Sequence, residues 1–277
     1  MSYTVERLFF KSGARKGQPN GQYLVRWDDY GATREVKLPG VTTVIKAGLP
    51  EGQGMKNWRT NCGVEAACGA LRLRLATGRS LTAALLAIIE KEAKAEPDRF
   101  RDEAADIGTE VHRLIENWLR LGVEPDMNGR DERVINGWTA FREWWAASGF
   151  TPIRTEFAVA SLDLGCGGTV DCLALDPEFR RVLVDFKTSK SIYESHEIQA
   201  VTYARCVEDM GEEPVDRVVI GQFGKYDATF NEREVEEHLW PGHLDQFRRC
   251  LGTREWLNAA TARYYARSNG RKVEVTA

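Results

Sequence analysis

Apolar and polar residues alternate along the first forty positions of the chain, which is the period of a β-strand with one buried face. Three segments carry this alternation, and turn-forming residues such as glycine, proline and aspartate separate them. The segments are 3–10, 22–27 and 33–38. The pattern predicts a small β-meander over residues 1–40.

Over residues 41–150 the apolar period changes to about 3.6, which is typical of helices. Ser80 is a candidate N-cap for a helix through Ala95, and the polar segment 126–131 predicts a break before a later helix. Five apolar residues between them recur at helical spacing and predict one buried face: Ile107, Val111, Leu114, Ile115 and Trp118. His112 lies at the edge of that face.

After residue 150 the period returns to 2. Three strands are predicted, then a helix, two further strands and a C-terminal helical region: 151–160, 168–175, 181–187, 194–208, 216–223, 226–230 and 232–267. Pro241 predicts a break in the last helical region. The expected fold class is therefore α/β, with a mixed central sheet flanked by helices. We expect one compact domain over residues 1–277, in which 41–150 is a helical insertion and 151–277 is the α/β core.

Two charged residues share one face of an otherwise apolar strand. Alternate residues of a strand point the same way, so Asp185 and Lys187 lie on the same face. A hairpin turn centred on Glu178 would place Asp171 directly opposite Asp185, with their Cβ atoms about 5 Å apart. The sequence thus predicts two carboxylates and one ammonium group in one place.

Two carboxylates at that distance on a half-buried sheet repel each other unless one is protonated or a cation lies between them. A hard divalent ion bound by carboxylate oxygens would supply the cation, and Lys187 adds a nearby positive charge. An exposed hairpin face with solvated charges is the alternative interpretation. A slip of the hairpin register would also separate the two carboxylates.

The residues from Gly168 to Asp171, followed by Asp185-Phe186-Lys187, resemble the motif of PD-(D/E)XK nucleases. Two further motifs resemble the RecB-like branch of that superfamily. They are Gly108-Thr-Glu-Val-His112 on a helix upstream and Gln199-Ala-Val-Thr-Tyr203 on the helix after the lysine strand. A spacing of four places Gln199 and Tyr203 on one helical face. The segment 38–45 is also similar to phage and mitochondrial single-strand exonucleases of this branch.

The resemblance implies a restriction-endonuclease-like core and a metal-dependent deoxyribonuclease that hydrolyses phosphodiester bonds and leaves 5′-phosphates. It implies a Mg²⁺ or Mn²⁺ ion held by His112, Asp171, Asp185 and the carbonyl oxygen of Phe186. A histidine in the ligand set favours Mn²⁺ more than an all-oxygen site would. Lys187 would join Asp171 and Asp185 as a catalytic residue.

The implied partner is DNA, as single strands or DNA ends, in repair or recombination. Gln199, Tyr203 and Lys190 are the expected substrate-binding residues. Glu156 lies on the strand that leads into the hairpin, where it is either an additional acidic residue of the site or a surface charge. Core packing is the expected role for most of the tryptophans at 138, 144 and 145.

Composition adds little to this interpretation but excludes some classes. Hydrophobic residues make up 43% of the chain and charged residues 29%, as in ordinary globular proteins. The net charge of −3 requires nucleic-acid binding to come from a local groove. We expect an intracellular protein, because no signal peptide or apolar membrane span is evident. The six cysteines lack metal-site spacing, so we expect most to be buried thiols and expect no iron–sulfur cluster.

Two other functions remain open at this point. A structure-specific endonuclease would use the same metal site, because end requirement depends on the shape of the substrate channel. A non-catalytic nucleic-acid-binding recombination protein could retain the nuclease fold. Such proteins typically lose one of the acidic residues or the lysine, whereas all four positions are filled here by His112, Asp171, Asp185 and Lys187.

Overall fold

The computed structural model describes residues 3–12 and 16–268. The chain forms two compact units, one of Met1–Leu49 with Val111–Ala277 and one of Pro50–Glu110. The first unit contains a five-stranded mixed sheet flanked by helices, which confirms the predicted fold class. The second unit consists of part of the segment that we expected to be a helical insertion.

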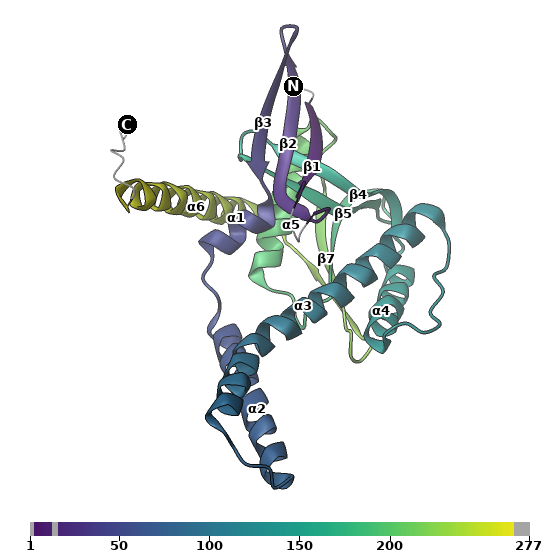
Figure 1. Ribbon diagram of the computed structural model, residues 1–277. Helices are drawn as coiled ribbons and strands as arrows, with labels where there is room; N and C mark the ends of the chain where they lie inside the picture. The colour runs from purple at the N-terminus through teal and green to yellow at the C-terminus, as the bar shows by residue number, and fades with distance from the viewer. Residues whose placement is uncertain (1–2, 13–15, 269–277) are drawn as a thin grey trace. The chain divides into compact units, whose positions relative to one another are not determined.

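The N-terminal segment forms the predicted meander of three antiparallel strands, β1 (Tyr3–Phe9), β2 (Pro19–Asp29) and β3 (Ala32–Pro39), shown in Figure 1. Strands β2 and β3 are longer than expected, because their pairing continues to the Asp29↔Ala32 pair beside the turn. One face of this sheet is apolar. Its buried residues Tyr3, Val25 and Leu38 pack with Ala160 of the central sheet.

The second unit contains α2 (Gln53–Ala76) and the first part of α3 (Ala83–Leu121). The expected N-cap at Ser80 is wrong, because the α3 helix begins at Ala83 and the Thr82 hydroxyl accepts a hydrogen bond from the Leu85 N–H at 3.2 Å. The predicted helix end near Ala95 is also wrong. The helix continues through Pro97 into the segment that carries His112.

The central sheet has the strand order β4-β5-β6-β7-β8, in which only β6 and β7 pair in parallel. The strands are β4 (Thr151–Ser161), β5 (Cys166–Leu175), β6 (Arg181–Lys187), β7 (Arg217–Phe223) and β8 (Phe230–Glu234). The strand predicted at 226–230 is misplaced. The hydrogen bond from Gly224 N–H to the Thr229 carbonyl closes a turn there, so β8 begins only at Phe230.

Helices cover both faces of the sheet. Leu183 packs in the main core with α1 (Val41–Gly48), α5 (Glu194–Asp209) and α6 (Trp240–Ser268), whereas Phe186 packs among aromatic residues of α4 (Glu132–Ser148). Positions 183 and 186 have opposite parity on β6, so they point to opposite faces. Figure 1 shows α1 beside the start of α6, and the two helices are in contact.

The structure tests three further expectations. The tryptophans at 138, 144 and 145 are buried, as predicted. The break expected at Pro241 is wrong, because Pro241 lies in the first turn of α6, directly after the short 3₁₀ turn η1 (Glu237–Leu239). A proline in the first turn of a helix removes no intrahelical hydrogen bond. Four of the six cysteines are buried, and all six are free thiols. Among the described residues, no helix has the length and apolar character needed to cross a membrane.

Candidate active site

The hairpin of β5 and β6 has the register that the sequence predicts. The pairs run from Leu175↔Arg181 to Cys172↔Val184. One more step in this register places Asp171 opposite Asp185, although the two strands no longer pair there. The two carboxylates therefore stand at the point where the ladder ends.

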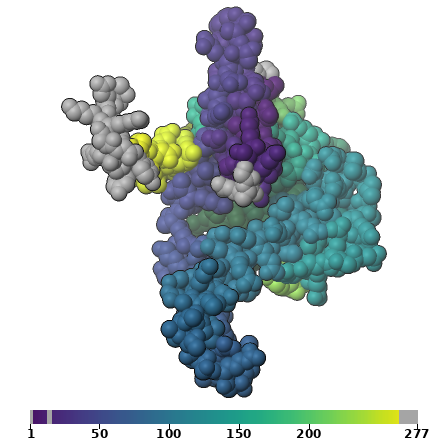
Figure 2. All heavy atoms as spheres, in the orientation of Figure 1, coloured from purple at the N-terminus to yellow at the C-terminus, as the bar shows by residue number. Residues whose placement is uncertain are grey.

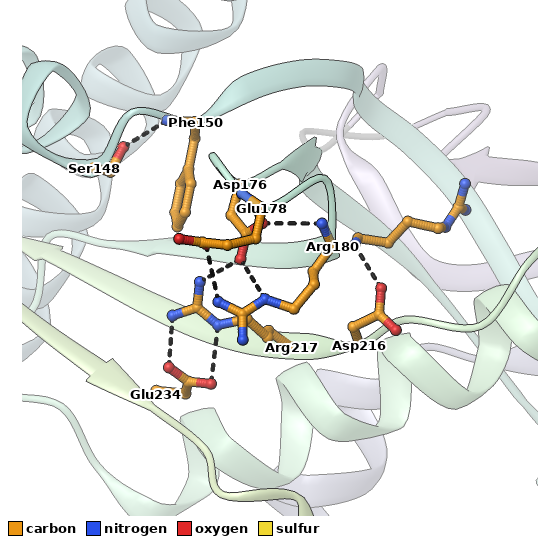
Figure 3. Close-up of polar contacts among 9 residues, drawn as sticks. Ser148, Phe150, Asp176, Glu178, Arg180, Asp216, Arg217 and Glu234 are labelled. Carbon is orange, nitrogen blue, oxygen red and sulfur yellow. Dashed lines mark hydrogen bonds and ion pairs between the residues drawn. The ribbon is translucent and has the colours of Figure 1, made fainter.

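The opposite end of the same hairpin is fixed by the buried carboxylate of Asp176 (Figure 3). Its Oδ1 accepts hydrogen bonds from the N–H groups of Glu178 and Arg180 at 3.0 and 2.9 Å. Its Oδ2 accepts from Arg180 Nε at 2.8 Å and Arg217 Nη1 at 2.9 Å, and Arg217 also pairs with Glu234. Burial alone would raise the pKa of Asp176, but these hydrogen bonds outweigh it and lower the pKa to about 2.

Asp185 is completely buried, and its two oxygens have different partners. Oδ1 accepts a hydrogen bond from Gln199 Nε2 at 3.1 Å. Among the residues that the structure describes, Oδ2 has one partner, the ammonium group of Lys187, with which it forms a close ion pair. Burial raises the pKa of Asp185, and the nearby Asp171 carboxylate adds to this, while Lys187 opposes it. Asp185 Oδ2 can therefore accept a further hydrogen bond or bind a cation.

Asp171 has the opposite balance. Its Oδ2 accepts the Phe186 N–H at 2.7 Å, and its Oδ1 lies 3.7 Å from His112 Nδ1. Burial would raise the pKa of Asp171, but His112, Lys187 and the Phe186 N–H together lower it. For His112, burial acts in the opposite direction and would lower the pKa, because it disfavours the charged imidazolium. The Asp171 carboxylate outweighs burial and raises the pKa of His112. Asp171 and Asp185 therefore differ in protonation behaviour.

Glu156 joins this group from β4. His112, Glu156 and Asp171 each offer a ligand atom within 4.8 Å of the others. Glu156 has φ 46°, a left-handed conformation that is uncommon outside glycine and is often found at functional sites. Burial, followed by the Asp171 charge, raises the pKa of Glu156 to about 7. One imidazole and two carboxylates form a donor set that suits Mg²⁺ or Mn²⁺.

The motif residues Gln199 and Tyr203 do share one face of α5, where Gln199 Nε2 lies 3.3 Å from Tyr203 Oη. Tyr203 is only 5% exposed. A Cβ atom added to Gly168 would lie 2.1 Å from the Tyr203 ring, and one added to Gly167 would lie 2.7 Å from Tyr23. Gly168 of the hairpin motif and the preceding Gly167 are therefore required, because a tyrosine packs directly on the backbone of each.

Lys190 is exposed on the loop that follows β6. The buried side chain of Gln222 holds this loop, because its Nε2 donates to the Ser189 carbonyl at 2.9 Å and its Oε1 accepts from Asn231 at 2.7 Å. Sequence reasoning did not single out Gln222. The signal was an amide at a position of β7 that is otherwise flanked by apolar residues.

No protein-family model matches the chain, and no curated protein matches its sequence. Among solved structures, the chain is similar to an alkaline exonuclease from Laribacter hongkongensis, with 13% identity and a TM-score of 0.35 over 80% of this chain and 93% of that chain. It is also similar to a candidate exonuclease from Eubacterium rectale, with 13% identity and a TM-score of 0.32 over 66% of this chain and 72% of that chain. Because both likenesses are distant, we infer function from the residues and contacts of the site.

Proposed function

We propose that this chain is a metal-dependent deoxyribonuclease, a phosphodiester hydrolase of the PD-(D/E)XK superfamily and its RecB-like branch. The observation that supports this most is the buried Asp185 carboxylate, whose Oδ2 has, within the described part of the chain, the Lys187 ammonium as its one partner. It stands opposite Asp171 in register, next to the cluster of His112 and Glu156. A buried group of carboxylates is destabilising unless a cation binds it or some of the carboxyls are protonated, and a bound cation keeps them ionised at neutral pH.

The residues that would hold Mg²⁺ or Mn²⁺ are His112, Asp171, Asp185 and the carbonyl oxygen of Phe186, with Glu156 as an additional carboxylate. When bound, such an ion polarises the scissile phosphate and lowers the pKa of a coordinated water. Gln199 fixes the orientation of the Asp185 carboxylate through its hydrogen bond to Oδ1. The Phe186 N–H does the same for Asp171.

Lys187 supplies the remaining positive charge. It shares a strand face with Asp185 and is mostly buried, with 15% of its side chain exposed. In this position the ammonium group orients the attacking water and stabilises the negative charge that develops on the phosphoryl oxygens. The products are 5′-phosphates.

The proposed substrate is DNA, taken as single strands or ends by an exonuclease. Gln199, Tyr203 and Lys190 are the proposed substrate-binding residues. Since Tyr203 is largely buried against Gly168, we assign it a supporting contact, whereas Lys190 is exposed and available to a phosphate. A role in DNA repair or recombination would follow from this activity.

The test is digestion of single- and double-stranded DNA labelled at either end, with Mg²⁺, Mn²⁺ or a chelator. We expect cleavage with either metal, none with the chelator and none with Asp185→Asn. Calorimetric titration of Mn²⁺ should show weaker binding to Asp185→Asn, and equal affinity would contradict the ligand assignment. Circular single strands separate the alternatives: cleavage of circles indicates an endonuclease. Binding without cleavage of any substrate indicates a non-catalytic protein.

A further inference from the structure

Arg7 is a charged residue on the apolar face of the N-terminal sheet. Strand β1 pairs with β2 in the register Tyr3↔Trp27, Val5↔Val25 and Arg7↔Tyr23. Tyr3, Val5 and Arg7 therefore alternate onto one face, and Arg7 stands directly opposite Tyr23 on that face. The register shifts immediately after Arg7, and such bulges often re-aim a side chain beside an active site.

Tyr23 connects this face to the catalytic hairpin. Its side chain packs on the backbone of Gly167, where an added Cβ would lie 2.7 Å from it. Its Oη lies 3.0 Å from the Thr169 hydroxyl, two residues before Asp171. Arg7, the neighbour of Tyr23 across the two strands, is thus placed beside the cluster that contains Glu156 and Asp171. Consistent with this, the charge of Arg7 lowers the pKa of both Tyr23 and Glu156, against the stronger effect of burial.

The Arg7 backbone belongs to the β1–β2 ladder, but its guanidinium makes no ion pair or hydrogen bond with any residue that the structure describes. Arg26, on the opposite face of the same sheet, pairs with Glu6 and Glu35 at 3.1 and 3.2 Å. Arg7 is exposed, and Figure 2 shows the atoms of β1, in dark purple, open to solvent. An exposed guanidinium beside a carboxylate-rich site has the chemistry to bind an anion that approaches that site.

We propose that Arg7 binds a phosphate of the nucleic acid strand next to the scissile phosphate, so that the N-terminal sheet forms part of the substrate site. This inference rests on the proposed nuclease function. The guanidinium is suited to the role because it remains charged and presents paired N–H donors that match phosphate oxygens. Arg7 would hold the strand in place and would leave metal binding and the chemical step to other residues.

The experiment measures binding of a fluorescent single-stranded oligonucleotide in Ca²⁺ over a series of salt concentrations. The proteins are wild type, Arg7→Gln, Arg7→Lys and the matched control Arg26→Gln, which removes the same charge from the opposite face. We expect Arg7→Gln to weaken binding roughly tenfold. The slope of log affinity against log salt should fall by about 0.7, the loss of one phosphate contact to a single strand. Arg7→Lys should retain most of the slope, and Arg26→Gln should bind as wild type does.

Catalysis and metal affinity provide the second readout. Arg7→Gln should cleave at the wild-type rate once it is saturated with DNA and should bind Mn²⁺ with unchanged affinity. Wild-type affinity and slope in Arg7→Gln, or an equal loss in Arg26→Gln, would overturn the proposal. So would a parallel loss of Mn²⁺ affinity, which would mean that Arg7 supports the fold of the site. Failure of the nuclease function itself is distinguishable, because wild type would then cleave no DNA under any metal condition.

Discussion

At the scale of single residues, the site is a set of charged groups in which nearby positive charges offset the unfavourable effect of burial on the ionised carboxylates. Burial disfavours the ionised form of Asp185, and the Lys187 ammonium opposes that effect. Asp171 stays ionised more readily because it accepts a backbone N–H and lies near His112. The pair therefore behaves as one strongly and one weakly acidic carboxyl. Such a division of protonation behaviour is common where acid–base chemistry takes place.

Lys187→Ala should lower the rate of cleavage far more than it lowers affinity for DNA. A group that stabilises charge in the transition state typically contributes ~10²–10³-fold in rate. Single-turnover cleavage at saturating DNA measures the rate, and binding in Ca²⁺ measures affinity. The control is Lys190→Ala, in which an exposed lysine is lost and the main effect should be on binding. A Lys187→Ala variant that cleaves at the wild-type rate once saturated would show that Lys187 merely binds substrate.

Gly168→Ala should destabilise the protein by about 1–3 kcal/mol, because the added Cβ would overlap the Tyr203 ring at 2.1 Å in a packed core. Unfolding by urea, monitored by circular dichroism, measures the change. Gly252→Ala is the matched control: an added Cβ on α6 meets nothing within 4 Å, and alanine favours the helix. Equal stability of the two variants would contradict the packing role of Gly168.

At the scale of elements, the β5–β6 hairpin determines whether the carboxylates meet. A slip of one residue in its register would move Asp185 to the other face of the sheet. The turn is fixed by Asp176, which joins the hairpin to β7 through Arg217. The main core on one face and the aromatic cluster on the other also hold β6, through Leu183 and Phe186. The register is therefore fixed both by polar contacts at the turn and by apolar packing.

Asp176→Asn should destabilise the fold by about 3 kcal/mol at pH 7, because two guanidinium groups lose a buried carboxylate. The pKa of Asp176 is lowered in the folded protein from 3.8 to about 2. Its contribution to stability is therefore fully present above pH 4 and is lost as the pH falls through about 2. Denaturant unfolding from pH 7 down to pH 2 should show the variant and wild type converging. Asp163→Asn, an exposed control with 70% side-chain exposure, should change stability little. A difference that stays constant with pH would contradict this account.

At the scale of the whole molecule, the site joins segments that are distant in sequence. His112 comes from α3, Glu156 from β4 and Asp171 from β5, while Tyr23 of the N-terminal sheet packs on the same hairpin. A ligand that binds these groups together binds only the folded chain. Its binding free energy therefore adds to the stability of the fold.

Mn²⁺ at a hundredfold excess over its dissociation constant should stabilise the protein by about 2.7 kcal/mol and raise the midpoint of thermal unfolding by roughly 5 °C or more. Differential scanning calorimetry with Mn²⁺ and with a chelator measures this shift. Asp171→Asn should lose the shift, whereas Lys190→Ala should keep it. An identical shift in Asp171→Asn and wild type would show that the ion binds elsewhere.

The sequence alone determined the contacts that are local in the chain. Strand period and turn position predicted the apposition of Asp171 and Asp185 and the shared face of Asp185 and Lys187, because the two strands of a hairpin are close in sequence and the position of their turn sets the register. The shared helical face of Gln199 and Tyr203 followed from their spacing in the same way. The α3 helix that continues through Pro97 and the later start of β8 were not predictable, because packing and turn hydrogen bonds override local propensity.

The tertiary structure alone decided which elements meet at the hairpin. The tertiary structure placed Glu156 with His112 and Asp171. The residue type of Glu156 gives no signal of its left-handed backbone conformation. The fold also packed Tyr203 and Tyr23 on Gly168 and Gly167, and so brought the N-terminal sheet against the β5–β6 hairpin. The physical reason is that the apolar pattern of an element shows which face is buried but not which partner buries it. That choice depends on complementary packing between segments far apart in the chain.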